Sequence, residues 1–440
     1  MRKPLILRGA RQVGKTWLVR DLALRNNKEL IELNFERDPA LKRLFISNDP
    51  NIILGEISLW IGRTVNRDKV LLFLDEIQAA SEILAKLRWF AEELPQLPVI
   101  AAGSLLEFIL SEHTFSIPVG RVGFLHVDPM FFPEYLAANG QDLLLERLTT
   151  WNPPQEFSSV LHEQSMMWFY RYCMIGGMPA VVESDIAGLG PAKVRERQYD
   201  LAAAFRSDFS KYGKRFDSEI LEATLNAVAG SLGKKFIYAH VRDGLKQHQA
   251  QDALNMLINA RICHIVKHSS ANGLPLGGEI KESMRKVILN DVGLLHALQR
   301  TPAQDMFPMW DTIAPQVRMQ IIEQVVGQQL RRLGPLSGDG PQLYYWQREG
   351  GRPGEIDYLI QISDRIVPVE LKSGPTGSMK SLHQFMFDKK LKIALRFDSN
   401  PPSQFDSMFK TTQGNPVEYH LRSLPYYMAG FQGKEIFPVG

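Results

Sequence analysis

Gly9 to Thr16 reads G-A-R-Q-V-G-K-T and directly follows an apolar run, Leu5 to Leu7, and Arg8. Its spacing is G-x-x-x-x-G-K-S/T, which is that of a phosphate-binding P-loop between a strand and a helix. Glycines at both ends allow a tight turn whose N–H groups point at a polyphosphate, while the next helix presents its positive end. A chance glycine-rich turn is the alternative, but the strand before the loop and the apolar-periodic helix from Trp17 favour the P-loop.

The side chains of this loop have distinct expected roles. Lys15 is expected to reach the β- and γ-phosphates of ATP, and Thr16 to hold Mg²⁺ through its hydroxyl. The residues expected to contact the nucleotide are Gly9, Ala10, Arg11, Gln12, Val13, Gly14, Lys15, Thr16 and Trp17. The sequence therefore predicts ATP and Mg²⁺ as cofactors.

Hydrolysis requires a second, carboxylate-bearing strand beside the loop, and Val70 to Asp75, V-L-L-F-L-D, supplies one. Its apolar residues suit a parallel strand buried on both faces, with the acid at the carboxyl end where such sheets bind ligands. Asp75 is the candidate to hold Mg²⁺ through water, and Glu76 to orient or deprotonate the attacking water. The alternative, that the two acids cap the following helix, is compatible with catalysis.

Bulk properties are those of an ordinary globular protein. At 440 residues the chain is long enough for two or three domains. A net charge of +3 neither predicts nor excludes nucleic acid. Cys173 and Cys263 are far apart in sequence, which argues for a reducing interior and against a zinc or disulfide framework. Apolar runs are too short for a membrane span, so we expect a cytoplasmic protein without a membrane partner.

Residues 1–135 alternate strands and helices, which predicts an α/β domain with a parallel sheet covered on both faces. Beyond the two strands above, we expect a strand at Leu30 to Asn34, a helix at Ala40 to Ile46, and a buried strand at Leu97 to Ala102. Ser104 follows the last of these. A polar residue at the tip of a strand beside the carboxylate strand can sense the γ-phosphate, although a Gly-Ser turn is common in any protein.

Arg121, in V-G-R-V, is the candidate guanidinium that stabilises charge at the γ-phosphate. It would act within its own chain or from a neighbouring subunit, and the second case would require a homo-oligomer. Arg11, inside the loop, is a rival for this role.

These motifs together resemble a prokaryotic group of AAA-type P-loop ATPases that carry a C-terminal domain of unknown function. The segments that carry the resemblance are G-A-R-Q-V-G-K-T, L-F-L-D-E-I-Q, A-G-S, G-R-V, F-F-P-E-Y, G-G-M-P at 176–179 and D-V-G-L-L at 291–295. The likeness covers nearly the whole chain and implies an ATPase domain followed by a winged helix. Members usually have a segment before the first strand that supplies adenine contacts, whereas here the strand begins almost at Met1.

Residues 136–278 are expected to form a helical lid and the winged helix. The pattern is a helix at Glu219 to Leu232, a second helix at Gln247 to Asn259, a strand at Arg261 to His268, and a glycine-rich tip at Ser269 to Gly278. As a DNA reader this module would offer Gln247, His248, Gln249 and Gln251 to bases and Lys234, Lys235 and Arg242 to phosphates. Packing as a lid or an oligomerisation surface is the alternative, because no concentrated basic face is present.

Residues 279–440 change character. A helix at Met319 to Leu333 precedes strands at Leu343 to Trp346, Glu355 to Ile360 and Ile366 to Lys372, and a helix and the strand Leu391 to Phe397 follow. Alternation of period two places Glu370 and Lys372 on one face of their strand, beside the strand of Asp357.

An acid followed by Glu-x-Lys on adjacent strands suits metal-dependent phosphodiester cleavage. Asp357, Glu370 and the carbonyl of Leu371 would hold Mg²⁺, and Lys372 would position or deprotonate water. The pattern looks like the PD-(D/E)xK restriction-endonuclease superfamily, whose first helix often adds an acid. Glu323 occupies that place here.

Some assignments in this set stay open at the sequence level. Gln384 matches a further frequent polar position of the superfamily, and Glu355 competes with Asp357 for the first acidic slot. An E-x-K on an exposed strand is also common in ordinary sheets. The order of elements is what favours the nuclease-like α/β domain.

The sequence therefore predicts a P-loop ATPase that couples its nucleotide state to a metal-dependent, nuclease-like C-terminal domain acting on DNA. The alternative is a nucleotide-controlled switch or adaptor whose C-terminal domain binds DNA or a protein partner without cutting. The complete Asp357, Glu370 and Lys372 set favours the first interpretation, and the small net charge favours the second.

Overall fold

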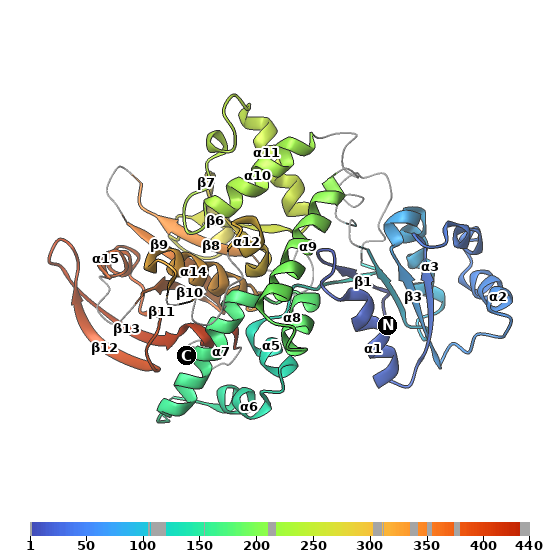
Figure 1. Ribbon diagram of the computed structural model, residues 1–440, viewed down its shortest axis with the longest axis horizontal. Helices are drawn as coiled ribbons and strands as arrows, with labels where there is room; N and C mark the ends of the chain where they lie inside the picture. The colour runs from blue at the N-terminus through green and yellow to red at the C-terminus, as the bar shows by residue number, and fades with distance from the viewer. Residues whose placement is uncertain are drawn as a thin grey trace. The chain divides into compact units, whose positions relative to one another are not determined.

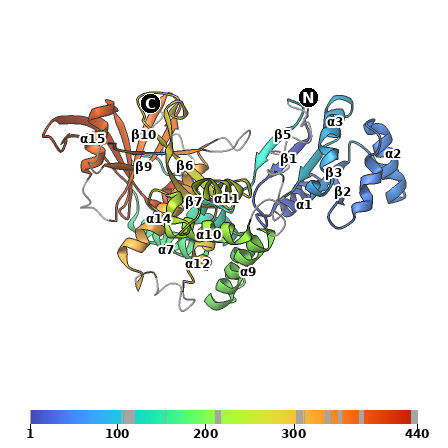
Figure 2. The same ribbon diagram turned by 90° about the horizontal axis from the view of Figure 1, so that it is seen from above.

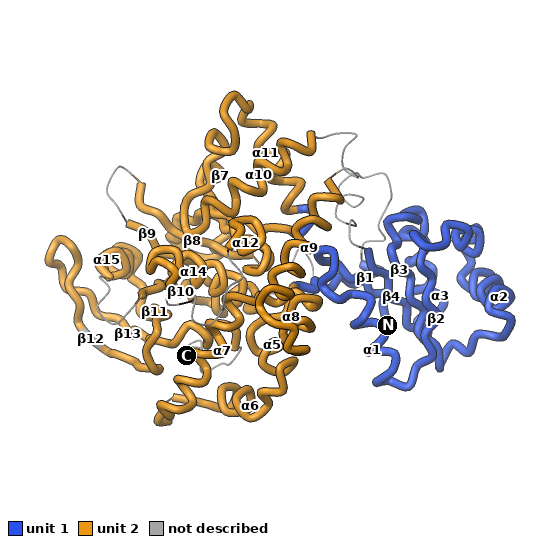
Figure 3. Tube along the Cα trace, in the orientation of Figure 1, with its two compact units in different colours: residues 1–128, 259–261, 335–340 blue, residues 129–258, 262–334, 341–440 orange. Residues whose placement is uncertain are grey.

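The chain divides into two compact units, which Figure 3 colours separately. The N-terminal unit comprises residues 1–128, 259–261 and 335–340, and the C-terminal unit comprises residues 129–258, 262–334 and 341–440. The computed structural model describes residues 2–103, 106, 120–153, 155–209, 217–301, 310, 312–334, 342–349, 354–373 and 379–431.

A five-stranded sheet with every pairing parallel forms the centre of the N-terminal unit. Its strands are β1 (Leu5–Arg8), β2 (Glu29–Asn34), β3 (Val70–Asp75), β4 (Val99–Ala102) and β5 (Gly123–His126), in the order β2-β3-β4-β1-β5. Strand β4 therefore lies between the strand that precedes the P-loop and the strand that ends in Asp75. The parallel sheet expected from the sequence is confirmed.

Helical segments cover both faces of this sheet, which explains why all six residues of β3 are buried. Val70, Leu72 and Leu74 belong to a core cluster shared with α2 (Pro50–Ile61), α3 (Leu87–Glu93) and the 3-10 segments η1 (Pro39–Phe45) and η2 (Ile77–Lys86). The opposite face of the sheet is contacted by α1 (Lys15–Arg25), which buries Val19 and Ala23. Figure 1 shows these elements in blue.

The sequence analysis missed helix α2 and described η1 as an ordinary helix. Both ends of α2 carry recognisable signals, since the Asp49 side chain accepts the N–H of Asn51, Pro50 begins the helix, and Gly62 ends it with φ 74°. The buried residues Pro50, Ile53, Leu54 and Ile57 also have the i, i+3, i+4, i+7 spacing of an amphipathic helix, so caps and periodicity both mark α2.

The C-terminal unit combines helices with an eight-stranded mixed sheet (Figure 1 and Figure 2). Its helices include α5 (Phe132–Ala138), α6 (Asp142–Thr150), α7 (Ser159–Ile175), α8 (Pro179–Ile186), α9 (Pro191–Phe209), α10 (Ser218–Gly230), α11 (Gln247–Asn259), α12 (Val292–Leu298), α14 (Pro315–Arg331) and α15 (Lys380–Lys389). The strands are β6 (Cys263–Ser269), β7 (Ile280–Leu289), β8 (Leu343–Gln347), β9 (Glu355–Ile362), β10 (Arg365–Leu371), β11 (Ile393–Asp398), β12 (Ser403–Lys410) and β13 (Pro416–Pro425). Their order in the sheet is β12-β13-β11-β10-β9-β8-β6-β7.

The last third of the chain has the order of elements that the sequence predicted: α14, β8, β9, β10, α15 and β11. Strands β8, β9 and β10 pair antiparallel, and β11 returns parallel to β10 after the crossover through α15. Asp357 on β9 and Glu370 on β10 thus come from neighbouring strands.

The hairpin that we expected to be a free wing is part of this sheet. Strand β6 pairs antiparallel with β7 on one side and parallel with β8 on the other, where Val266 faces Leu343. The tip between them is packed as well, because Ala271 and Leu276 lie in a core cluster with Trp346 and Phe385, among others. The expected boundary at residue 278/279 therefore falls inside the β6–β7 hairpin, and residues 262–334 form one compact unit with the C-terminal strands.

Asp291 joins two of the glycine motifs of the sequence. Its buried carboxylate accepts the N–H of Gly177 at 2.7 Å and the N–H of Gly293 at 2.8 Å, so it both caps α12 and holds the turn between α7 and α8. Gly177 has no room for a side chain, since an added Cβ would overlap the backbone of Met130. The motifs G-G-M-P and D-V-G-L-L are therefore two sides of one packing contact.

None of the helices in the described part of the chain is both long and apolar enough to cross a membrane.

We predict that Asp291→Ala lowers the free energy of unfolding of the C-terminal unit by about 2–4 kcal/mol, because two buried N–H groups lose their acceptor. Denaturant unfolding followed by circular dichroism measures this. Asp217→Ala is the matched control: Asp217 is an exposed helix cap that accepts the N–H of Glu219, and its loss should cost about 1 kcal/mol. Equal effects of both substitutions would contradict the role given to Asp291.

Candidate functional site

The P-loop turns between β1 and α1 with a backbone that suits glycine. Gly9 has φ 152° and Gly14 has φ 92°, and Gln12 between them has φ 65°. Gly14 is the N-cap of α1 and no side chain caps it, so the first N–H groups of the helix face the loop. An added Cβ at Gly9 would overlap the backbone carbonyl of Val127, which follows β5.

Lys15 is buried and folds back onto its own loop. Its ammonium donates to the carbonyl oxygen of Gly9 at 2.9 Å and to that of Ala10 at 2.7 Å. Burial lowers the pKa of Lys15 to about 8, although the nearby carboxylates of Glu76 and Asp75 oppose this shift. An incoming phosphate would replace two carbonyl oxygens with a full negative charge, which is the stronger partner for an ammonium group.

Thr16 and Asp75 meet at the carboxyl edge of the sheet. The Thr16 hydroxyl lies 3.4 Å from each carboxylate oxygen of Asp75, and the Asn34 amide donates to Asp75 Oδ2 at 3.0 Å. Burial and the neighbouring Glu76 raise the pKa of Asp75, so a cation here would relieve an unfavourable charge. The oxygen ligands and the site both suit Mg²⁺.

Glu76 is held in an unusual conformation directly after β3. Its φ of 50° lies in the left-handed region, and its carboxylate accepts a hydrogen bond of 2.5 Å from the amide of Gln78. The side chain makes no capping bond to the following segment, so the capping interpretation of this acid is not supported. The side chain is fixed by Gln78 instead, which leaves it available to orient water.

Asn34 and Gln78 are polar residues of this site that the sequence analysis missed. Asn34 could have been found, because it ends the predicted strand beside the Asp75 strand, and parallel strands place their carboxyl ends at one edge. Gln78 lies within the quoted motif L-F-L-D-E-I-Q and carries no comparable signal. An added Cβ at Gly103 would overlap its side chain. Ser104, the predicted phosphate sensor, lies outside the described residues.

The remaining predicted nucleotide residues lie as follows. Within the loop, Ala10 and Val13 are buried, and Trp17 on α1 is 64% exposed. Arg121 lies two residues before the start of β5, whose first residue faces Leu5 at the start of β1, and its guanidinium pairs with Glu92 at 2.9 Å. Arg121 thus lies at the edge of the sheet opposite the P-loop. Of the two roles expected for Arg121, the one at a neighbouring subunit's nucleotide therefore stays a prediction.

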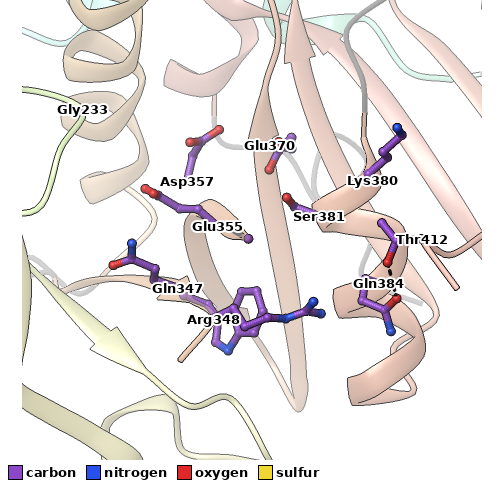
Figure 4. Close-up of a pocket in the computed structure, with 12 residues that line it drawn as sticks. Gly233, Gln347, Arg348, Glu355, Asp357, Glu370, Lys380, Ser381, Gln384 and Thr412 are labelled. Carbon is purple, nitrogen blue, oxygen red and sulfur yellow. Dashed lines mark hydrogen bonds between the residues drawn. The ribbon is translucent and has the colours of Figure 1, made fainter. Parts of the chain in front are cut away.

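The second candidate site is a pocket of about 610 Å³ in the C-terminal unit, shown in Figure 4. Its lining residues are Gly233, Trp346, Gln347, Arg348, Gly354, Glu355, Asp357, Glu370, Lys380, Ser381, Gln384 and Thr412. Carboxylates from β9 and β10 lie in one part of it. The Arg348 guanidinium and the Gln384 amide lie away from them, and the Lys380 ammonium lies apart from both. Gln384, the further polar residue expected from the sequence, lies on α15. Its amide donates to Asp388 and accepts a hydrogen bond from the Thr412 hydroxyl.

Asp357 and Glu370 differ in how their oxygens are used. Asp357 Oδ2 accepts the N–H of Leu371 at 2.8 Å, which fixes it beside β10. Glu370 Oε1 pairs with the Lys372 ammonium at 2.5 Å, whereas Glu370 Oε2 is buried and has no hydrogen-bond partner among the described residues. Burial, together with the nearby Asp357, raises the pKa of Glu370 to about 8. A buried, unpartnered carboxylate oxygen facing a pocket fits a metal ligand.

Glu323 and Glu355 belong to a separate ion-pair group. Lys286, on β7, lies 2.9 Å from Glu323 Oε1 and also pairs with Glu355. Burial opposes the charge of Lys286, but the carboxylates around it raise its pKa, while burial raises the pKa of Glu323 to about 7. Lys286 was not foreseen, since nothing in the sequence distinguishes it from other lysines of that strand.

These contacts favour Asp357 for the slot that the sequence left open and change one expectation. Asp357, not Glu355, lies beside Glu370, because Glu355 is engaged by Lys286. Glu323 was predicted to join Asp357 and Glu370 as a metal ligand, yet its carboxylate is held by Lys286. Within the described residues no three His, Cys, Asp or Glu side chains are arranged to hold one ion. The fit is therefore to two carboxylates and a carbonyl oxygen.

Comparison with protein families matches residues 1–136 to an AAA domain. Two further family models, each described as a domain of unknown function, match residues 166–305 (DUF8612) and 320–400 (DUF4143). The N-terminal part of this chain is therefore a P-loop domain of the AAA ATPase type, in agreement with the resemblance read from its motifs.

No curated protein matches the chain. Among solved structures, the Walker-type ATPase paby2304 of Pyrococcus abyssi is 16% identical over 68% of this chain and 91% of that one, with a TM-score of 0.41. A likeness of this degree carries no argument about the activity of this chain.

We predict that Lys15→Ala reduces ATP hydrolysis to background, because the loop loses its only ammonium group, the one expected to bind the β- and γ-phosphates. A phosphate-release assay on purified protein measures this, with Lys42→Ala, a half-buried lysine that lies 3.8 Å from Glu82, as the control that retains activity. Undiminished hydrolysis in the Lys15 variant would refute the P-loop assignment.

We predict that Glu76→Gln slows hydrolysis by roughly 10²–10⁴-fold while ATP binding is retained, because a general base is lost and the phosphate contacts are not. Fluorescent-nucleotide titration and single-turnover hydrolysis separate the two effects. Glu93→Gln, an exposed residue of α3, should change neither. A Glu76 variant that loses affinity as much as turnover would indicate a structural role.

Proposed function

We propose that this protein is an ATP hydrolase whose nucleotide state controls a metal-dependent, nuclease-like C-terminal site that acts on DNA. The observation that carries the second half of this proposal is the buried Glu370 Oε2, which has no partner among the described residues, on a residue that lines the pocket with Asp357.

For the ATPase half, the chain supplies each group that phosphoryl transfer to water requires. The loop N–H groups and Lys15 would bind the phosphates, and Thr16 and Asp75 would hold Mg²⁺, which neutralises charge on the phosphates when bound. Glu76, fixed by Gln78, would orient the attacking water.

For the nuclease-like half, support comes from the order of elements from α14 to β11, which resembles the PD-(D/E)xK superfamily. Asp357, Glu370 and the Leu371 carbonyl would hold Mg²⁺, which polarises a phosphodiester when bound. Lys372 lies 2.5 Å from Glu370 and would steady the attacking water or the developing negative charge. Arg348 and Lys380 on the same pocket would bind neighbouring phosphates.

DNA is proposed as the partner because cationic and amide side chains flank this pocket. Gly233 lines it, and the exposed Lys234 and Lys235 follow directly in the chain. On α11, Gln247, His248 and Gln251 are exposed, as a helix that reads base edges requires. The expected wing is packed into the sheet. The surface proposed for DNA therefore consists of helix α11 and the turn that carries Lys234 and Lys235.

A route for nucleotide control begins within the ATPase unit. Gly9, the first glycine of the P-loop, packs closely against the backbone carbonyl of Val127. The Val127 N–H donates to the carbonyl oxygen of Arg8 at 2.8 Å. The C-terminal unit begins two residues later, at Pro129. A change in the loop on ATP binding would therefore act directly on the segment that connects the two units. Arg121 acting on a neighbouring subunit's nucleotide would add a homo-oligomer to this scheme.

The alternative function is a non-cleaving, nucleotide-controlled switch or adaptor that binds DNA or a protein partner. One observation favours it: each carboxylate of the pocket already has one oxygen partnered within the protein, by Lys372, Lys286 or the Leu371 N–H. A pocket of this kind could be kept for binding alone.

We predict that the protein nicks or linearises supercoiled DNA in Mg²⁺ or Mn²⁺, and that ATP changes the rate. Gel electrophoresis of supercoiled and linear DNA, with and without ATP, measures both effects. Glu370→Ala should abolish cleavage and keep ATP hydrolysis, whereas Glu418→Ala, an exposed glutamate on β13, should change neither. Intact ATP hydrolysis with no cleavage under any condition would replace the nuclease proposal with the switch or adaptor.

A further inference from the structure

Lys286 reaches the carboxylate pocket from outside the predicted nuclease motif. It lies on β7, whose hairpin partner β6 pairs with β8, and it is only 3% exposed. Its ammonium contacts Glu323 on α14 and Glu355 on β9, and it lies 5.4 Å from the ring centre of Tyr345 on β8. Three elements thus fix the position of this one charge.

The charges around Lys286 indicate how much negative charge in the pocket is left to be balanced by a bound cation. Four carboxylates form a carboxylate cluster here, namely Glu323, Glu355, Asp357 and Glu370, and they influence one another's charge. Two ammonium groups, Lys286 and Lys372, face this cluster among the described residues. When all four carboxylates are ionised, two negative charges are left, which one divalent ion would neutralise.

The two lysines leave different amounts of room for an ion. Lys372 contacts Glu370 through Oε1 alone, so Oε2 stays buried without a partner among the described residues, and Glu370 lines the pocket together with Asp357. Lys286 instead lies between Glu323 and Glu355, where a second ion of a two-metal site would need its ligands. A second ion that used Glu323 and Glu355 as ligands would therefore have to displace this ammonium.

Building on the proposed metal site, we infer that Lys286 is a built-in cation that replaces a second metal ion, so that the pocket binds one divalent ion at Asp357 and Glu370. Glu323 is then a positioning residue for Lys286 and not a metal ligand. The β6–β7 hairpin thereby supplies a permanent positive charge to the proposed nuclease-like site.

The experiment counts Mn²⁺ ions in nucleotide-free protein by electron paramagnetic resonance, and assigns to the pocket those ions that are lost in Glu370→Gln. Wild-type protein should bind one such ion. Lys286→Met, which keeps most of the side-chain volume and removes the charge, should bind two, with the spectral signature of a coupled Mn²⁺ pair.

Two matched lysine variants serve as controls. Lys286→Arg keeps the charge and should stay at one ion. Lys281→Met removes a more exposed lysine of the same strand, which pairs with Glu349 at 2.5 Å, and should also stay at one ion.

A further variant tests the inference if Lys286→Met does not fold. Glu323→Gln should still bind one ion, because Glu323 holds Lys286 and not the metal. Loss of that ion in Glu323→Gln, two coupled ions in wild-type protein, or a single ion in folded Lys286→Met would each overturn the role of Lys286 while leaving a metal site in place. No ion in wild-type protein that depends on Glu370 would overturn the proposed metal site itself, and the inference with it.

Discussion

The ion pairs that Lys286 forms with Glu323 and Glu355 are the interaction on which the pocket of the C-terminal unit depends. A charge this deeply buried is tolerated only when its partners are in place, since an unpaired buried charge costs several kcal/mol. Strand β7, helix α14 and strand β9 must therefore be assembled together. The same requirement explains Gly233, where φ is 67° and an added Cβ would press against the Glu323 carboxylate. It also explains why the hairpin is fused to the C-terminal sheet and is not a free wing.

Both candidate sites contain a buried lysine that is held by internal acceptors, but the chemistry of those acceptors differs. Lys15 is bound by two carbonyl oxygens, and burial lowers its pKa. Such a lysine gains by exchanging its partners for an anion, as nucleotide binding requires. Lys286 is surrounded by carboxylates, which outweigh burial and raise its pKa. Moving Lys286 away from these carboxylates would lose favourable charge interactions, which suits a permanent structural charge. The surrounding groups, and not the residue type, thus separate a ligand-binding lysine from a fixed one.

Much of the fold could be predicted because its signals are local. The P-loop spacing, the apolar strand that ends in Asp75, and the strand with Glu370 and Lys372 each carry their own pattern of residues. Helix α2 was missed although its signals are local too: its caps, Asp49 and Gly62, and the helical spacing of Ile53, Leu54 and Ile57. The boundary expected near residue 278 falls between the paired strands β6 and β7, for a different reason. The pairing of β6 with β8 joins residues that are about 75 positions apart, and no local pattern reports such a contact.

By itself the sequence determined the chemistry of this protein: a loop that can bind polyphosphate, an acid strand beside it, and an acid followed by Glu-x-Lys on adjacent strands. These are properties of spacing, and spacing along a strand or turn fixes which side chains share a face. Only the tertiary structure decided which partners each charge has. It placed Arg121 at the far edge of its sheet, gave Glu323 and Glu355 to Lys286, and left one oxygen of Glu370 buried without a partner among the described residues. The reason is physical: the charge state and availability of a buried group depend on every element packed around it, and those elements come from distant parts of the chain.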